Sequence, residues 1–175
     1  MKTLVILGYG GYGKTIEDVV LSANMYDKII FLDDGSSDAR VEGKCADFER
    51  YMGSDVHFYP AFGNNGLRMG WIDRLEKAGA VVPTIIHPKA YVSRNAQLGT
   101  GCTVLPNATV NVTAVLGKGC IINFGAVVDH DVVLGDGVHL CPNSTVKAYN
   151  FVPALSKLES GKAILNNTFK QEKSR

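Results

Sequence analysis

The residues best suited to chemistry form an Asp-His-Asp run at positions 129–131, directly after an apolar stretch. Carboxylates beside His130 would raise its pKa, and one of them could hold a ring nitrogen as N–H, leaving the other nitrogen to accept a proton. Such a charged group next to a hydrophobic lattice is costly without a function. The run is therefore a candidate general base; the alternative is a solvated turn that does no chemistry.

A second candidate site is the glycine-rich stretch from Gly8 to Lys14, GYGGYGK. It follows an apolar run, residues 3–7, and precedes a segment with helical spacing, residues 15–23. In that strand–turn–helix context the G-x-G-x-x-G spacing suits a nucleotide, because glycines permit a tight turn and amides at a helix N-terminus attract phosphate. A glycine-rich turn that binds nothing is the alternative.

Carboxylates follow the next expected strand, residues 28–32. Asp33 and Asp34 lie about twenty residues after the glycines, where such groups can accept hydrogen bonds from a ribose or a base. A third strand at 56–59 and a helix at 66–78, with Asn64 or Asn65 as its N-cap, complete the first domain, residues 1–82. This is about half of a full dinucleotide fold and has room for one nucleotide, which argues against a nicotinamide reductase.

The Asp-His-Asp run lies within a repeat of six residues. Every sixth residue is aliphatic: Ile86, Val92, Leu98, Val104, Val110, Leu116, Ile122, Val128, Leu134, Leu140, Val146, Val152, Leu158 and Ile164. This period fits neither a helix nor an isolated strand, but it fits a parallel β-helix in which three hexads of short strands and turns make one coil of eighteen residues. We expect this domain to span residues 83–169, followed by a charged tail, residues 170–175.

The composition restricts the kinds of partner and the location expected for the protein. The formal net charge is +1 and the basic residues are scattered, so a nucleic-acid partner is not expected. The four cysteines, at positions 45, 102, 120 and 141, have no metal-ligand spacing and favour reduced thiols. Neither a signal peptide nor a membrane span is expected, and the cytoplasm is the predicted location.

The order of parts resembles the bacterial sugar O-acyltransferase family, which includes sialic acid O-acetyltransferases and N-acetyltransferases of UDP-linked 4-amino sugars. The resemblance rests on the segments Gly8 to Lys14, Phe31 to Asp34, Gly63 to Asn65 with Arg68, His87-Pro88, Gly119 to Asn123 and Ala126 to Asp131. It implies an α/β Rossmann-like domain followed by a left-handed parallel β-helix of hexapeptide repeats, assembled as a homotrimer.

The resemblance also implies roles for individual residues. The nucleotide of a UDP-sugar would be held by Gly8, Gly10, Gly11, Gly13, Lys14, Asp33, Asp34, Gly63 and Asn64. His130 matches the family's general base, Asp131 the carboxylate that orients it, and His139 a histidine near the acyl donor. Acetyl-CoA would lie between β-helices of neighbouring subunits, with no metal. A sugar amine or hydroxyl would lose its proton to His130 while attacking the thioester; Cys141 is a less favoured nucleophile.

Two departures from the family leave alternatives open. Tyr12 occupies a loop position that usually holds histidine, and barely two coils follow His130, so the β-helix is C-terminally short and its CoA site could be altered or lost. A non-catalytic nucleotide-sugar-binding or assembly protein is therefore the first alternative. An acyltransferase that acts on a free small molecule, such as an amino acid, is the second.

Overall fold

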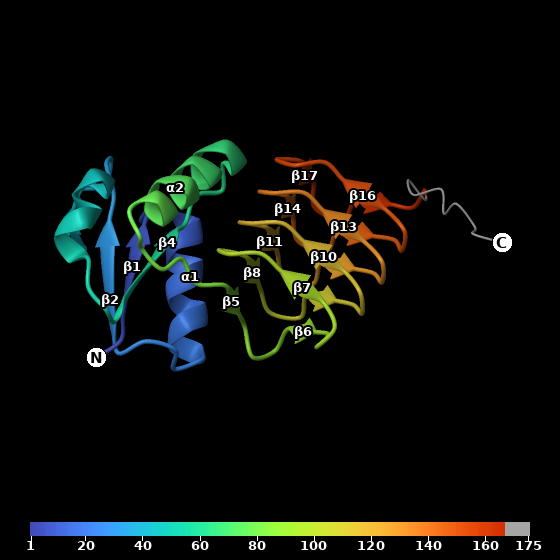
Figure 1. Cartoon of the computed structure of the whole chain (residues 1–175), viewed down its shortest axis with the longest axis horizontal. Helices are drawn as coiled ribbons and strands as arrows, with labels where there is room; N and C mark the ends of the chain where they lie inside the picture. The colour runs from blue at the N-terminus through green and yellow to red at the C-terminus, as the bar shows by residue number, and fades with distance from the viewer. Residues whose placement is uncertain (167–175) are drawn as a thin grey trace. The chain divides into compact units, whose positions relative to one another are not determined.

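The structure is a computed structural model that describes residues 1–166 of the chain (Figure 1). It divides into two compact units, Met1–His87 and Pro88–Arg175. The sequence placed this division at residue 82. The charged tail expected at 170–175 and the last residues of the domain expected at 83–169 lie outside the described residues.

The first unit is built on a four-stranded parallel sheet in the order β3-β2-β1-β4. Its elements are β1 (Thr3–Leu7), α1 (Gly11–Ser22), β2 (Lys28–Leu32), β3 (Val41–Gly43), the 3₁₀ helix η1 (Cys45–Tyr51), β4 (Val56–Pro60) and α2 (Asn65–Lys77). Strands β1, β2 and β4 were expected from their apolar runs. Strand β3 was not expected, because three residues are too few to show a periodicity. The order of strands and helices confirms a Rossmann-like unit.

Central strand β1 is buried along its whole length, as expected for a parallel strand covered on both faces. Val5 and Leu7 share a core with Phe58 of β4 and with Ile72 and Leu75 of α2. Because parallel strands end at the same edge of a sheet, the loops after β1, β2 and β4 meet at one edge. The glycine-rich stretch begins in the first of these loops and continues into α1, and Asp33 and Gly63 belong to the other two.

The second unit is a β-helix of short parallel strands (Figure 1), each of two residues. After β5 (Ile85–Ile86), the strands are β6 (Tyr91–Val92), β7 (Gln97–Leu98), β8 (Thr103–Val104), β9 (Thr109–Val110), β10 (Val115–Leu116), β11 (Ile121–Ile122), β12 (Val127–Val128), β13 (Val133–Leu134), β14 (His139–Leu140), β15 (Thr145–Val146), β16 (Phe151–Val152), β17 (Lys157–Leu158) and β18 (Ala163–Ile164). Partners in each sheet are eighteen residues apart; Val128 of β12, for example, faces Val110 of β9 and Val146 of β15. The coil length is therefore the one predicted, and the fold is the left-handed hexapeptide β-helix.

Three sheets form the sides of this β-helix. Their orders include β16-β13-β10-β7, β17-β14-β11-β8 and β18-β15-β12-β9-β6. The aliphatic residues of the hexad pattern fill the interior, and those from Val104 to Val152 are at most 2% exposed. Ile86 differs, since it is 38% exposed and Ile85 is the buried residue of that pair. The hexad pattern therefore fails at its first position.

The corners of the β-helix have a regular backbone conformation that the sequence analysis did not identify. Every sixth residue from Gly101 to Gly161 has a positive φ: Gly101, Asn107, Thr113, Gly119, Gly125, Asp131, Gly137, Asn143, Tyr149, Leu155 and Gly161. Glycine and asparagine adopt this left-handed conformation readily, whereas a β-branched or bulky side chain there is an outlier. Within residues 1–166, no helix has the length and apolar character needed to cross a membrane.

Candidate functional site

Each glycine of the loop after β1 has a distinct structural role. Gly8 has a φ of 105°, which few other residues adopt. A Cβ on Gly13 would lie 2.1 Å from the Gly8 carbonyl oxygen, so only glycine lets α1 approach the end of β1 this closely. A Cβ on Gly10 or Gly11 would meet no described atom within 4 Å. The backbone of these two residues is therefore open to a ligand at the start of α1.

Asp33, at the end of β2, holds this glycine loop in place. Its Oδ2 accepts a hydrogen bond from the N–H of Tyr9 at 2.7 Å, and its Oδ1 accepts from the N–H groups of Gly35 and Ser36 at 2.8 and 2.7 Å. Burial would raise the pKa of Asp33, but these three hydrogen bonds and the nearby charge of Lys44 outweigh it and lower the pKa. The carboxylate thus stays ionised and braces the loop.

The segment after β2 borders a shallow cavity, and Asp34 in this segment accepts hydrogen bonds from two residues that follow β3. Asp34 Oδ1 accepts a hydrogen bond from the N–H of Cys45 at 2.9 Å, and its carbonyl accepts one from Lys44 Nζ. The cavity has a volume of about 230 Å³ and is lined by Asp33, Ser36, Val41, Glu42, Gly43, Lys44 and Asp47. Its polar, charged lining at the carboxyl edge of the sheet suits a polar small-molecule ligand.

Two cations contact the aromatic ring of Tyr9 in the glycine loop. Lys14 Nζ lies 4.6 Å from the ring centroid, and the Arg40 guanidinium carbon lies 5.6 Å from it. Arg40 also forms an ion pair with Glu17 of α1. Positive charge beside open backbone amides would favour a phosphate. Sequence reasoning identified Lys14 but missed Tyr9 and Arg40, because no motif or period links position 40 to the loop.

The loop after β4 lies against the glycine loop, since a Cβ on Gly8 would contact both Ala61 and Phe62. Asn64 caps α2, its side-chain oxygen accepting from the N–H of Leu67 at 2.9 Å. Arg68 is fully buried and donates to the Phe62 carbonyl and to the Asn65 side chain. A Cβ on Gly63 would meet no described atom within 4 Å, so its backbone is accessible.

Tyr12, where the resemblance led us to expect histidine, lies in the first turn of α1. Its hydroxyl lies 3.0 Å from that of Tyr59 on β4, and their rings pack edge to face. The nine residues expected to hold a nucleotide thus lie in the loops after β1, β2 and β4 and in the first turn of α1. Asn64 and both aspartates, however, already use side-chain oxygens in hydrogen bonds to the backbone.

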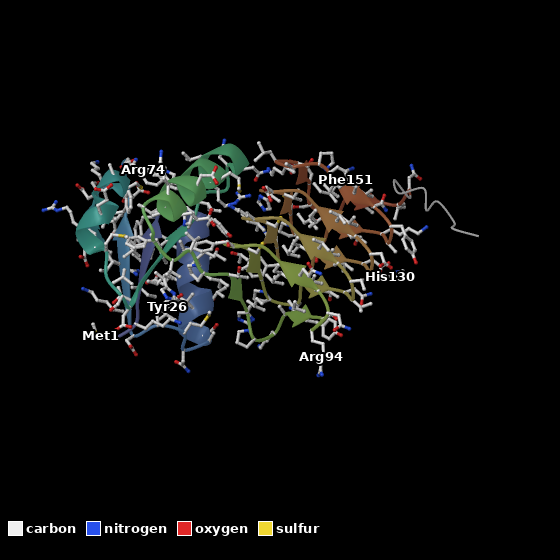
Figure 2. All side chains as sticks on the ribbon, in the orientation of Figure 1. Met1, Tyr26, Arg74, Arg94, His130 and Phe151 are labelled. Atoms are coloured by element: carbon white, nitrogen blue, oxygen red, sulfur yellow. The ribbon has the colours of Figure 1, made fainter. Side chains whose placement is uncertain are left out.

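His130 projects from the turn between β12 and β13, where Figure 2 labels it. Its Nδ1 lies 2.8 Å from Oδ2 of Asp131, and the two side chains are 39% and 41% exposed. The carboxylate holds Nδ1 in the N–H form, which leaves Nε2 as a proton acceptor. This hydrogen bond raises the pKa of His130, and the charges of Asp129 and Asp131 add to the effect against the opposing effect of desolvation.

Neighbouring coils support the Asp-His-Asp run. Asp129 Oδ1 accepts hydrogen bonds from Asn111 Nδ2 at 3.0 Å and from the N–H of His130 at 2.7 Å. Asp131 Oδ1 accepts one from the Thr113 hydroxyl at 2.7 Å. The Tyr149 ring lies 5.2 Å from that of His130, at 90°. Asn111, Thr113 and Tyr149 were missed, although each lies one coil of eighteen residues from Asp129 or Asp131.

His139 lies elsewhere on the coil. It belongs to β14, in the sheet β17-β14-β11-β8, whereas His130 lies between the other two sheets. Its Nε2 is 3.2 Å from Asn123 Nδ2, so it accepts that hydrogen bond. One chain therefore does not bring His139 and His130 together at one corner.

Cys141 is poorly suited to act as a nucleophile. It is 5% exposed, and its burial raises the thiol pKa, which disfavours the reactive thiolate. All four cysteines are free thiols. Within residues 1–166 no group of three or more His, Cys, Asp or Glu side chains could hold a metal ion.

A Rossmann-like unit with an open glycine loop, joined to a hexapeptide β-helix carrying a histidine–carboxylate pair, defines the class of β-helical acyltransferases. Residues 3–75 match the family model of the PglD N-terminal domain. Residues 113–148 match that of the bacterial transferase hexapeptide (six repeats).

Among solved structures, the acetyltransferase domain of PglB from Neisseria gonorrhoeae FA1090 is 30% identical, with a TM-score of 0.89 over 93% of this chain and 82% of that chain. Its complex with acetyl coenzyme A is 31% identical, with a TM-score of 0.88 over 93% and 81% of the two chains. The UDP-N-acetylbacillosamine N-acetyltransferase of Bacillus subtilis (strain 168) is 33% identical over 112 residues, which are 60% of this chain and 52% of that protein. The match thus spans about half the length of this curated relative.

The chain belongs to the bacterial hexapeptide-repeat sugar acyltransferase family, in the group with a PglD-type N-terminal domain.

Proposed function

We propose that the protein transfers an acetyl group from acetyl-CoA to the amine of a nucleotide-linked amino sugar, with His130 as the general base. The observation that carries this proposal is the 2.8 Å contact between His130 Nδ1 and Asp131, which leaves Nε2 free of that pairing and able to take a proton. The relatives support the choice of donor and acceptor, because one is a UDP-sugar N-acetyltransferase and another binds acetyl coenzyme A.

The chemical step needs only one proton acceptor. The acceptor nitrogen attacks the thioester carbonyl carbon while His130 Nε2 takes its proton, so that a C–N bond forms. The C–S bond then breaks, and the CoA sulfur leaves and receives the proton from the imidazolium. Asp131 keeps the imidazole oriented and stabilises the charge that it acquires. A raised pKa suits both roles, since the proton must be accepted and then returned.

The nucleotide is proposed to bind at the carboxyl edge of the first unit's sheet. The open amides of Gly10 and Gly11, beside Lys14, would contact the phosphates, and the cavity next to Asp33 would take a polar part of the ligand. Because Asp33 braces the loop, we assign it an indirect role in binding. We propose a homotrimer in which His139 of one chain approaches acetyl-CoA held against its neighbour, and the cytoplasm as the location, where both substrates are supplied.

The main alternative is a nucleotide-sugar-binding protein without transferase activity. The paired His130 and Asp131, supported from two neighbouring coils, argue against it, since a binding protein has no need of a poised base. No observation favours a free amino acid as acceptor.

Release of CoA from acetyl-CoA in the presence of a UDP-linked 4-amino sugar tests the proposal. We expect turnover that depends on both substrates, with the acetyl group on nitrogen by NMR of the product. Calorimetric titration with each substrate separates the alternatives. Binding of the UDP-sugar without binding of acetyl-CoA would contradict the transferase proposal.

A further inference from the structure

Strained corner residues of the β-helix gather around His130. Of the eleven corner positions with positive φ, seven hold glycine or asparagine, and four hold other residues: Thr113, Asp131, Tyr149 and Leu155. Three of these four are eighteen residues apart. They occupy what we call the His130 corner, formed by the turns 111–114, 129–132 and 147–150.

Packing alone does not call for Thr113 and Tyr149 at these positions. Glycine or asparagine fills the same position at every other corner except that of Leu155, and a β-branched or aromatic residue with positive φ is unfavourable. Strained residues persist where the surrounding structure holds them, and they concentrate at functional sites. The contacts that these two side chains make therefore indicate what they do.

Thr113 holds Asp131 from the preceding coil. Its hydroxyl donates a hydrogen bond to Asp131 Oδ1 at 2.7 Å, and its oxygen accepts one from the Asp131 N–H at 3.2 Å. Asp131 Oδ2 contacts His130. The two carboxylate oxygens are thus directed to different partners, which fixes the plane of the carboxylate and the direction from which it reaches the imidazole.

Tyr149 holds the same pair from the following coil. Its ring packs edge to face against the His130 ring, with centroids 5.2 Å apart. The turn that presents Tyr149 is itself fastened. The buried Asn150 side chain donates to the carbonyls of Lys147 and Ala148, and the Ala148 N–H donates to Asp129 Oδ2 at 3.3 Å.

We propose that Thr113 and Tyr149 are positioning residues that hold the His130–Asp131 pair from the coil on each side. This inference rests on the proposed function, in which His130 Nε2 takes the proton of the acceptor. An imidazole that is 39% exposed would otherwise rotate about its side-chain bonds and present Nε2 in several directions. The two contacts restrict it to one.

Substitution to glycine separates strain from function. Tyr149→Gly relieves the left-handed strain but removes the contact with His130, and Leu155→Gly relieves the same strain at a different corner. We expect both variants to have a melting temperature within a few degrees of the parent protein, or above it. Only Tyr149→Gly should lose activity, by about 10- to 100-fold in kcat with little change in either KM, as for other residues that support a functional group.

Substitution of Thr113 tests the hydrogen bond. Thr113→Val keeps the shape and removes the hydroxyl, whereas Thr113→Ser keeps the hydroxyl. In Thr113→Val we expect kcat to be about 10-fold lower. We also expect the acid limb of the pH profile to shift to higher pH, because Asp131 without the Thr113 hydrogen bond interacts more strongly with His130 and raises its pKa further. Thr113→Ser should restore both. A purely structural role would change stability without moving the pH profile.

His130→Ala, measured in parallel, separates a failure of the proposed function from a failure of the positioning role. Full activity in His130→Ala would overturn the proposed function. Loss of activity in His130→Ala together with parental kcat and pH profile in Tyr149→Gly and Thr113→Val would overturn the positioning role alone. Equal losses in Tyr149→Gly and Leu155→Gly would also overturn it, since the effect would then come from the corner backbone.

Discussion

Nδ1 of His130 lies 2.8 Å from Oδ2 of Asp131, the next residue in the chain. Asp131 has a φ of 55°, the left-handed conformation shared by the corner residues of the β-helix. The contact has an electrostatic consequence, because it raises the pKa of His130 and lowers that of Asp131. The pH dependence of activity should therefore report the raised pKa of His130.

The acid limb of kcat/KM should lie above the ordinary histidine pKa of about 6.5, because only the neutral imidazole accepts a proton. Asp131→Asn removes the main cause of the raised pKa. We expect its acid limb to move to lower pH, with kcat about 10- to 100-fold lower from loss of orientation. Glu159→Gln, an exposed carboxylate on the same β-helix, serves as the control. An unmoved limb in Asp131→Asn would show that another group titrates.

Removal of the base itself should stop transfer without unfolding the protein. General-base catalysis contributes about 10²- to 10⁴-fold, so we expect His130→Asn to lower kcat by that order. The melting temperature should hardly change, because the side chain is 39% exposed and fills no core space. Calorimetry should still detect both substrates. Near-parental turnover in this variant would exclude His130 as the base.

The glycine loop offers a matched pair of alanine substitutions. In Gly13→Ala the new Cβ would lie 2.1 Å from the Gly8 carbonyl oxygen, so β1 and α1 must separate, at a cost of about 1–3 kcal/mol in the free energy of unfolding. In Gly11→Ala the Cβ meets no described atom within 4 Å, and the helix should gain about 0.5 kcal/mol.

Of the two variants, the more stable one, Gly11→Ala, should be the one that loses nucleotide binding. We expect Gly11→Ala to bind a UDP-sugar at least about 10-fold more weakly despite its stability, because the methyl group occupies the space from which a phosphate would approach the amides. Denaturant unfolding and calorimetry measure the two quantities. Unchanged affinity in Gly11→Ala would place the phosphates elsewhere.

Asp33→Asn should loosen the glycine loop. The amide that replaces one carboxylate oxygen cannot accept from a backbone N–H, so either the Tyr9 donor or the Gly35 and Ser36 donors lose their acceptor. We expect a loss of about 1–2 kcal/mol in stability, since part of the group faces water, and a roughly 10-fold higher KM for the nucleotide sugar. Asp38→Asn, in the exposed loop that follows, is the control. A parental KM would mean that the loop needs no brace.

Sequence periodicity was sufficient to predict most of the fold. The hexad pattern predicted the coil length, and it did so because a short strand and its turn repeat without insertion, so that one interior residue recurs every six positions. It failed at Ile86, which is exposed although it fits the pattern. The glycine motif was readable because its spacing is local.

Contacts between distant positions were harder to predict. Arg40 contacts Tyr9 because of the course that the loop between β2 and β3 takes, and no sequence rule predicts that course. The Thr113 and Tyr149 contacts follow from an eighteen-residue offset, but only once strain at the corners marks those positions as unusual. The sequence therefore indicated His130 and Asp131 and omitted the residues that hold them.

The side-chain hydrogen bonds between coils at the His130 corner also affect the alignment of the coils during folding. Because the interior repeats nearly the same aliphatic residue, a slip of one whole coil would still match Val110 with a valine or a similar side chain. The same slip would separate Asn111 from Asp129 and Thr113 from Asp131. The hydrogen bonds that arrange the proposed base thus also favour the correct alignment of the coils.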